Sequence, residues 1–193
     1  MITLDQVKDL REKTGISVMQ CRKALEDAGG DMEKAIILLK KKGADIASKK
    51  SDRDLGAGAV ASYVHANGGI GAMVLLQCET DFVSKNKEFM DLARDIAMQV
   101  SATNPEFIRK DEVGENEIAK AKEVFQTELE GKPEELKEKI LQGKLDSYFQ
   151  EKILLEQPFI KNGDMTVGAL VEGAIQKFGE KIVIGKIARF SSN

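Results

Sequence analysis

Residues capable of covalent chemistry are few in this chain and are not grouped at any known spacing. The one histidine, His65, falls in a predicted strand, and nothing pairs it with a nucleophile or a set of metal ligands. Neither glycine-rich phosphate-binding motif, G-x-x-x-x-G-K-[S/T] or G-x-G-x-x-G after a strand, occurs. The acidic residues fall on predicted exposed helix faces, where no motif joins two of them for general acid–base catalysis. The sequence therefore favours a protein that works by binding, with no catalytic residues, metal site or cofactor.

One short segment does combine a carboxylate with a large aromatic side chain. Asp81 and Phe82 stand between Thr80 and Val83, at the junction of a predicted strand and a predicted helix. Local physics favours a structural interpretation, in which Thr80 or Asp81 caps the helix and Phe82 packs inward as a hydrophobic staple. The functional interpretation leaves Asp81 and Phe82 available to a partner molecule. Exposure of Phe82 is the property that separates the two interpretations.

The composition suits an ordinary globular protein. The 193 residues include 29 basic and 32 acidic side chains, so the strong cationic field of a nucleic-acid-binding protein is missing. The lysine runs 40–42 and 49–50 are interleaved with aspartates and lack aromatic neighbours for base stacking. The chain does not begin with a basic and then an apolar segment, and no stretch approaches the roughly 20 apolar residues that span a bilayer. We therefore expect a cytoplasmic protein without direct nucleic-acid or membrane contacts.

The two cysteines carry a further indication of the compartment. Cys21 and Cys78 are far apart in sequence, and each falls on an apolar face of its predicted element. This pattern favours buried free thiols over a disulfide or a metal site, and it fits a reducing environment.

Residues 1–43 predict a module of three amphipathic helices. A capping residue precedes each helix; the three are Thr3, Ser17 and Asp31. Glycines stop the first two helices, and the third is expected to end with a lysine run before Gly43. A unit of roughly 40 residues buries little apolar surface, so we expect it to be tethered to a larger core or to dock on a partner. The charged, glycine-containing segment 44–58 is the predicted linker.

Residues 59–193 predict an α+β core. Apolar residues alternate on both sides of a turn at Asn67–Gly69, which predicts a β-hairpin. Two amphipathic helices are predicted, with inward-facing residues from Phe89 to Val100 and from Val167 to Phe178. A last strand over 181–190 completes a small three-stranded antiparallel sheet, with both helices covering one of its faces.

Two charged helices are predicted within this core domain, over 115–130 and 133–150. They are joined by Gly131, Lys132 and Pro133, and proline suits the first position of a helix. Narrow apolar stripes of the two helices are expected to face each other; they consist of Ile118, Ala121, Phe125 and Leu129, and of Leu136, Ile140, Leu145 and Phe149. We therefore expect an antiparallel helical hairpin that protrudes as an arm.

The segment Thr80–Asn86 resembles the hallmark of the bacterial translation elongation factor Ts family. Other segments resemble further motifs of that family; they are Arg11–Gly15, Met19, Cys21, Lys23–Leu25, Gly30–Ala35, Pro105–Ile108 and Glu156–Lys161. These similarities run in order along the chain from Leu4 to Phe190. The resemblance therefore covers nearly the entire sequence.

This resemblance implies a nucleotide exchange factor for elongation factor Tu, the GTPase that carries aminoacyl-tRNA to the ribosome and must then release GDP. Such a factor makes no covalent bond, so no enzymatic activity is implied. In that family the N-terminal module, similar to ubiquitin-associated domains, docks on the nucleotide-binding domain of the GTPase, which makes Met19 and Lys23 candidate contacts. The resemblance also makes Thr80, Asp81, Phe82 and Val83 the implied partner-binding segment, in which the pair Asp81 and Phe82 intrudes near the nucleotide and displaces the partner's magnesium ion.

The sequence departs from the family pattern in two respects. Near the first candidate contact, the family commonly has small or glycine residues and an acidic one where this chain has Ile16, Ser17, Val18 and Gln20. Longer members also carry a second, related half of the core, which is absent here between Ala97 and Pro105. The resemblance implies that short members replace this half by forming a homodimer through their sheets.

An adaptor protein is the alternative function. In this hypothesis residues 1–43 bind a ubiquitin-like or nascent-chain surface, and Asp81 and Phe82 are dispensable. Nucleotide exchange instead makes that pair the most sensitive position in the chain. The predicted helical arm suits either role and does not separate them.

Overall fold

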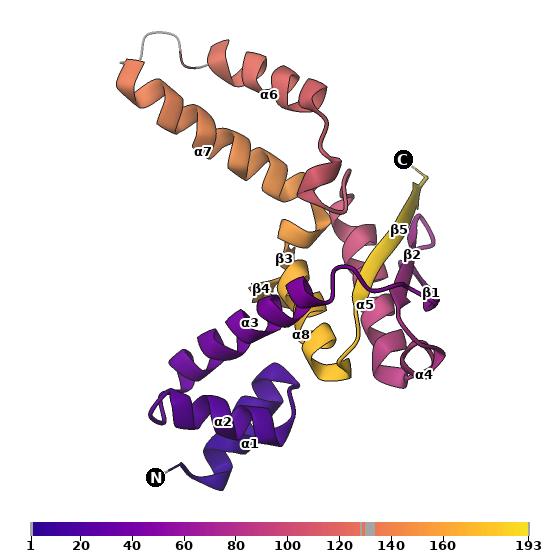
Figure 1. Ribbon diagram of the computed structural model, residues 1–193. Coiled ribbons are helices and arrows are strands. Elements are labelled where there is room, and N and C mark those ends of the chain that lie inside the picture. Colours follow the sequence, from indigo (N-terminus) through magenta and orange to yellow (C-terminus); the bar gives the residue numbers. More distant parts are fainter. Residues whose placement is uncertain (1, 128, 130–133, 193) are drawn as a thin grey trace.

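The computed structural model describes residues 2–127, 129 and 134–192, and it has the predicted α+β class (Figure 1). The α-helices are α1 (Leu4–Thr14), α2 (Val18–Asp27), α3 (Met32–Lys49), α4 (Asp81–Ser84), α5 (Lys87–Thr103), α6 (Glu115–Thr127), α7 (Glu134–Lys152) and α8 (Val167–Phe178). The strands are β1 (Ala57–Val64), β2 (Ile70–Cys78), β3 (Pro158–Phe159), β4 (Asn162–Thr166) and β5 (Ile182–Ser191). Two short 3-10 helices, η1 (Lys110–Glu112) and η2 (Leu154–Glu156), complete the elements of the described chain.

The three N-terminal helices form as their caps predict. Thr3 and Gln6 make a reciprocal capping box, and Ser17 and Asp31 accept hydrogen bonds from the first turns of α2 and α3. Gly15 ends α1 with a φ of 67°, a left-handed conformation that favours glycine. The helices enclose a small core of their own, which consists of Val7, Leu10, Ile16, Cys21, Ala24, Leu25, Ala35 and Leu39.

The predicted end of the third helix at Gly43 is wrong, because α3 continues through this residue to Lys49. Residues 44–49, predicted as part of the linker, are therefore helical. A Cβ atom at position 43 would lie 3.3 Å from the Gln176 side chain of α8, so glycine here permits close packing of two helices. Ile46 then packs against the main core, which supports the extra turns.

The three-stranded antiparallel sheet is confirmed, with strand order β1-β2-β5. Ala61 is paired with Val74, which in turn is paired with Ile187. Helices α4, α5 and α8 contact the sheet, and most buried residues of the main core come from the strands and from these helices, with Ile108 and Leu154 added. Phe89 of α5 is fully buried and meets the ring of Phe178 edge-on, with centroids 6.2 Å apart.

A second, two-stranded sheet of β3 and β4 was not predicted, because strands this short show no periodic pattern. The buried amide of Gln99 supports it. Its Nε2 donates to Gln157 Oε1 at 3.0 Å and to the carbonyl of Pro158 at 3.2 Å, and its Oε1 accepts from the Ile160 amide at 2.8 Å. This sheet lies between the base of α7 and the start of α8 (Figure 1).

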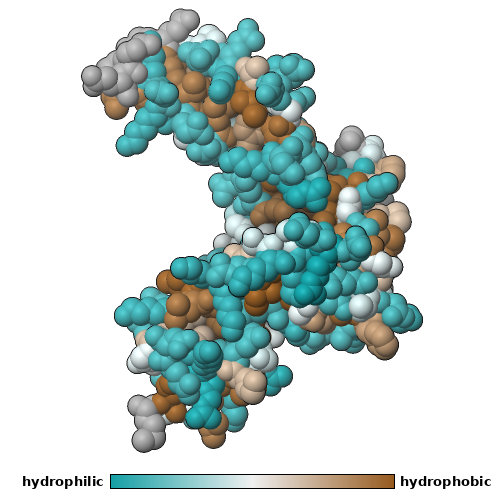
Figure 2. Space-filling view, viewed as in Figure 1, coloured by the Kyte–Doolittle hydropathy of each residue, from teal (hydrophilic) through white to brown (hydrophobic). Residues whose placement is uncertain are grey.

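Helices α6 and α7 lie side by side and extend away from the sheet (Figure 1). Hydrophobic side chains gather along the seam between them (Figure 2). Phe125 meets Tyr148 there with ring centroids 5.6 Å apart, while Leu136, predicted in the seam, is half exposed because the apolar residues of α7 are spread around the helix. The predicted Gly131–Pro133 connection lies outside the described residues. No described helix is both long and apolar enough to cross a membrane.

Candidate partner-binding site

The turn between β2 and α5 presents Asp81 and Phe82 to solvent. Phe82 is 85% exposed, whereas the neighbouring Val83 is buried in the main core. Thr80 makes no side-chain capping bond to α4, and its hydroxyl instead donates to Glu180 Oε1 at 2.5 Å. The interpretation of Thr80 as a side-chain cap and of Phe82 as an inward staple is therefore wrong. Val83 anchors the turn while Phe82 points away from the core.

Asp81 carries its charge beside this exposed ring. Lys85 Nζ lies 2.6 Å from Asp81 Oδ2, one helical turn further along the chain. The hydrogen bond from Lys85, together with its positive charge, lowers the pKa of the Asp81 carboxyl below its ordinary value. Asp81 is therefore ionised at neutral pH, and the turn offers an anionic oxygen next to a large apolar surface.

The second pair of predicted contacts lies on α2, far from the turn (Figure 1). Met19 is 82% exposed and Lys23 is exposed as well. The two residues are four positions apart, so their side chains share one face of the helix. The structure thus places the predicted contacts at two separate positions, one on the N-terminal module and one on the core.

Three of the four departures from the family pattern have structural roles in this chain. Ile16 is buried in the core of the N-terminal helices, and Ser17 caps α2. The side chain of Gln20 accepts a hydrogen bond from Gln176 Nε2 at 2.9 Å, which links α2 to α8. Val18, the fourth departure, is half exposed at the first position of α2.

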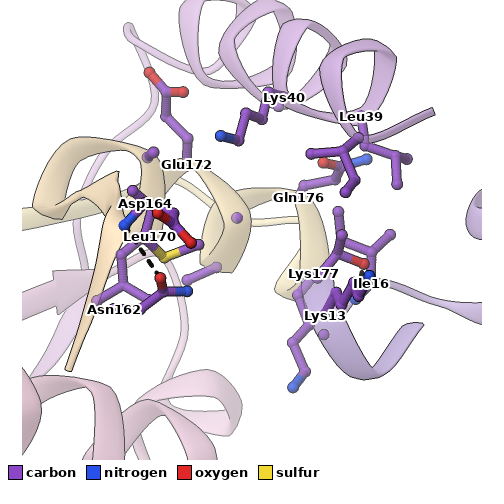
Figure 3. A pocket seen from close by; sticks show the side chains of 18 of the residues that line it. Lys13, Ile16, Leu39, Lys40, Asn162, Asp164, Leu170, Glu172, Gln176 and Lys177 are labelled. Carbon is purple, nitrogen blue, oxygen red and sulfur yellow. Dashed lines mark hydrogen bonds between the residues drawn. The ribbon is translucent and has the colours of Figure 1, made fainter. Parts of the chain in front are cut away.

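A cleft of about 770 Å³ lies between the N-terminal helices and α8, beside the contact of α3 with α8. Lys40 of α3 faces Glu172 of α8 across it, and Ile16, Leu39 and Leu170 provide apolar surface (Figure 3). Burial raises the pKa of the Glu172 carboxyl above its ordinary value. The residues that line the cleft include neither histidine nor cysteine.

The remaining chemically active residues are isolated in the described part of the chain. His65 Nδ1 lies 3.3 Å from the hydroxyl of Tyr63 at an exposed position. Cys21 and Cys78 are buried free thiols, as predicted, and burial raises the pKa of each. No group of three or more described His, Cys, Asp or Glu residues is placed to hold a metal ion. The fold and the exposed turn define an α+β binding protein that acts through contacts.

Comparisons with known proteins identify the family. A family model described as "Elongation factor TS" matches residues 25–191. The chain is 47% identical over 98% of its length to elongation factor Ts of Desulforamulus reducens, covering 88% of that protein. It is 48% identical to the protein of the same name from Carboxydothermus hydrogenoformans, over 98% of this chain and 88% of that protein. For the one from Thermodesulfovibrio yellowstonii the identity is 46%, over 98% and 95%.

The chain belongs to the elongation factor Ts family. It is therefore a nucleotide exchange factor for elongation factor Tu in translation elongation. Members of this family are not enzymes, so the exposed side chains described above act by binding.

Proposed function

We propose that Asp81 and Phe82 enter the nucleotide site of elongation factor Tu, displace its magnesium ion and so release GDP in the cytoplasm. The observation that carries this proposal is the 85% exposure of Phe82 on a turn anchored by the buried Val83. A bound divalent ion is the largest local charge in a nucleotide site, so disturbing its coordination weakens phosphate binding. Thr80 and Val83 hold the turn from which the pair projects.

Met19 and Lys23 are proposed to dock the N-terminal module, a three-helix unit similar to ubiquitin-associated domains, on the nucleotide-binding domain of the GTPase. Burying an exposed methionine side chain contributes roughly 1.5–3 kcal/mol, enough for a tenfold or larger change in affinity. The exchange protein weakens nucleotide binding to the GTPase by a certain ratio. By thermodynamic linkage, GDP or GTP must weaken binding of the exchange protein to the GTPase by the same ratio.

Stopped-flow release of a fluorescent GDP analogue from elongation factor Tu tests this proposal. We expect the wild-type chain to accelerate release, and Met19→Asp to raise the half-saturating concentration about tenfold because a docking contact is lost. Met19→Leu is the matched control, because it keeps the apolar surface. A release rate that the wild-type chain leaves unchanged would contradict exchange and favour the adaptor.

The sheet face that points away from α5 and α8 supports the proposed homodimer. Apolar side chains on this outer sheet face are largely exposed: Val60 by 58%, Val64 by 64%, Met73 by 48% and Phe190 by 71%. Their positions alternate with more buried ones along the strands and lie on the same side in the strand pairing, so they share one surface. Large exposed apolar patches mark protein interfaces, and a second copy offers an identical, self-complementary patch.

Replacing Phe190 by aspartate is expected to weaken this dimer at least about tenfold, because it places a charge in the apolar interface. Phe190→Leu keeps the surface apolar and should leave the dimer largely intact. Sedimentation velocity over a range of protein concentrations measures both. A wild-type chain that stays monomeric at high concentration would rule the homodimer out.

A further inference from the structure

The carboxylate of Glu180 holds the backbone immediately before Asp81. Its Oε2 accepts hydrogen bonds from the amides of Glu79 at 3.1 Å and Thr80 at 3.0 Å, and its Oε1 accepts one from the Thr80 hydroxyl at 2.5 Å. Glu180 lies in the turn between α8 and β5, 100 residues from Thr80. One side chain therefore fixes the chain direction at the start of the exposed turn.

Residues 79–80 and 180–181 each provide both donors and acceptors to the other segment. The carboxylate of Glu79 accepts a hydrogen bond from the Lys181 amide at 2.6 Å and one from Arg53 Nη1 at 3.0 Å. The bond from Lys181, reinforced by Arg53, lowers the pKa of the Glu79 carboxyl, so this acceptor is ionised at neutral pH. Residues 79–80 and 180–181 thus clasp each other through two carboxylates.

The same clasp secures the segment that leads from the N-terminal helices to the core. Lys181 Nζ donates to the backbone carbonyls of Ser51 at 2.5 Å and Arg53 at 2.8 Å. Lys50 Nζ donates to the carbonyl of Gly179 at 2.5 Å. The segment 50–56 has no helix or strand of its own, so these bonds hold its path between α3 and β1, in addition to the packing of α3 on α8. A Cβ atom at Gly56 would lie 3.0 Å from the Glu79 carbonyl, which shows how closely this segment approaches the clasp.

We propose that Glu180 and Lys181 are positioning residues, which fix Asp81 and Phe82 relative to the N-terminal module. This inference rests on the proposed function, in which Met19 and Phe82 engage one partner together. Two contacts on one rigid body bind in a single arrangement, whereas a loosened turn must be ordered again at each encounter. The positioning role therefore affects the release step, while docking through Met19 remains.

The test compares Glu180→Ala with a control that loses a similar carboxylate bond elsewhere. Glu106→Ala serves as the control, because Glu106 bonds Lys152 Nζ at 2.5 Å at the base of the arm, away from the clasp. In stopped-flow GDP release, we expect Glu180→Ala to lower the maximal accelerated rate about tenfold. The half-saturating concentration should change less than about twofold. Glu106→Ala should resemble the wild type in both values.

A second readout reports the position of the turn without the GTPase. The chain contains no tryptophan, so Phe82→Trp introduces a single fluorescent probe at the exposed turn. In this background we expect Glu180→Ala to lower the fluorescence anisotropy of the probe, because the turn moves more freely, and Glu106→Ala to leave it unchanged. If Glu180→Ala does not fold, Thr80→Val removes one bond of the clasp and Thr80→Ser restores it, with the same expected direction.

The outcomes separate the two proposals. A Glu180→Ala variant that releases GDP as fast as wild type, in an assay where Phe82→Ala is impaired, would overturn the positioning role and leave the proposed function standing. If the wild-type chain does not accelerate release, the proposed function fails. The anisotropy then decides about the clasp, because an unchanged value overturns it and a lowered value supports it.

Discussion

Replacing Phe82 by alanine is expected to remove most of the acceleration of GDP release without changing the stability of the fold. The side chain is 85% exposed, so its removal leaves no cavity in the core. Burying it in a partner contributes about 2 kcal/mol, which corresponds to a loss of roughly thirtyfold in the release rate at a fixed concentration. Stopped-flow release from elongation factor Tu measures the loss, and thermal unfolding followed by circular dichroism measures the stability.

One control variant and one further test variant accompany this experiment. Ile160→Ala removes another exposed apolar side chain, 44% exposed, from the turn between β3 and β4, and should leave release unchanged. Asp81→Asn keeps the shape of the side chain but removes its negative charge. We expect a partial loss of the accelerated GDP release, because a neutral amide interacts with ions less strongly than a carboxylate does. A Phe82→Ala variant as active as wild type would contradict the proposed role of the pair and favour the adaptor.

Local signals in the sequence predicted most of the elements. The caps at Thr3, Ser17 and Asp31 predicted where α1 to α3 begin, and alternating apolar residues predicted the strands of the main sheet. These features depend on residues a few positions apart, which is the range that patterns report. The prediction failed where a distant contact decides, as at Gly43, where packing against α8 keeps a helix running through glycine.

The site shows the same division. Its location at a strand–helix junction was predictable, but local physics assigned Thr80 to a helix cap. The Thr80 hydroxyl donates its hydrogen bond to Glu180, 100 residues away, and no pattern in a single sequence connects these two residues. The roles of Glu79 and Lys181 were not predicted for the same reason, because charged residues outside a motif are usually interpreted as solvent-exposed surface. The exposure of Phe82 follows from this long-range clasp and from the burial of Val83.

Replacing Phe89 by alanine is expected to have the largest effect on stability. The side chain is fully buried in the main core and meets Phe178 edge-on. Removing a buried phenylalanine loses its transfer free energy and leaves a cavity, at a typical cost of about 3–5 kcal/mol. Urea unfolding should therefore show a midpoint shifted far to lower concentration, with the adjacent Met90→Ala, at a 41% exposed position, changing stability by less than about 0.5 kcal/mol.

Loss of stability, compared with loss of exchange activity, distinguishes the buried Phe89 from the exposed contact residue Phe82. Phe89→Ala loosens the core that holds Val83, so exchange should fail together with the fold of the main sheet and the helices that cover it. The N-terminal helices have only a small core of their own and pack on α8 through α3, so we expect them to unfold together with the rest. Phe82→Ala should lose exchange with both parts intact. Equal stability of Phe89→Ala and wild type would mean that the packing around α5 and α8 does not hold the turn.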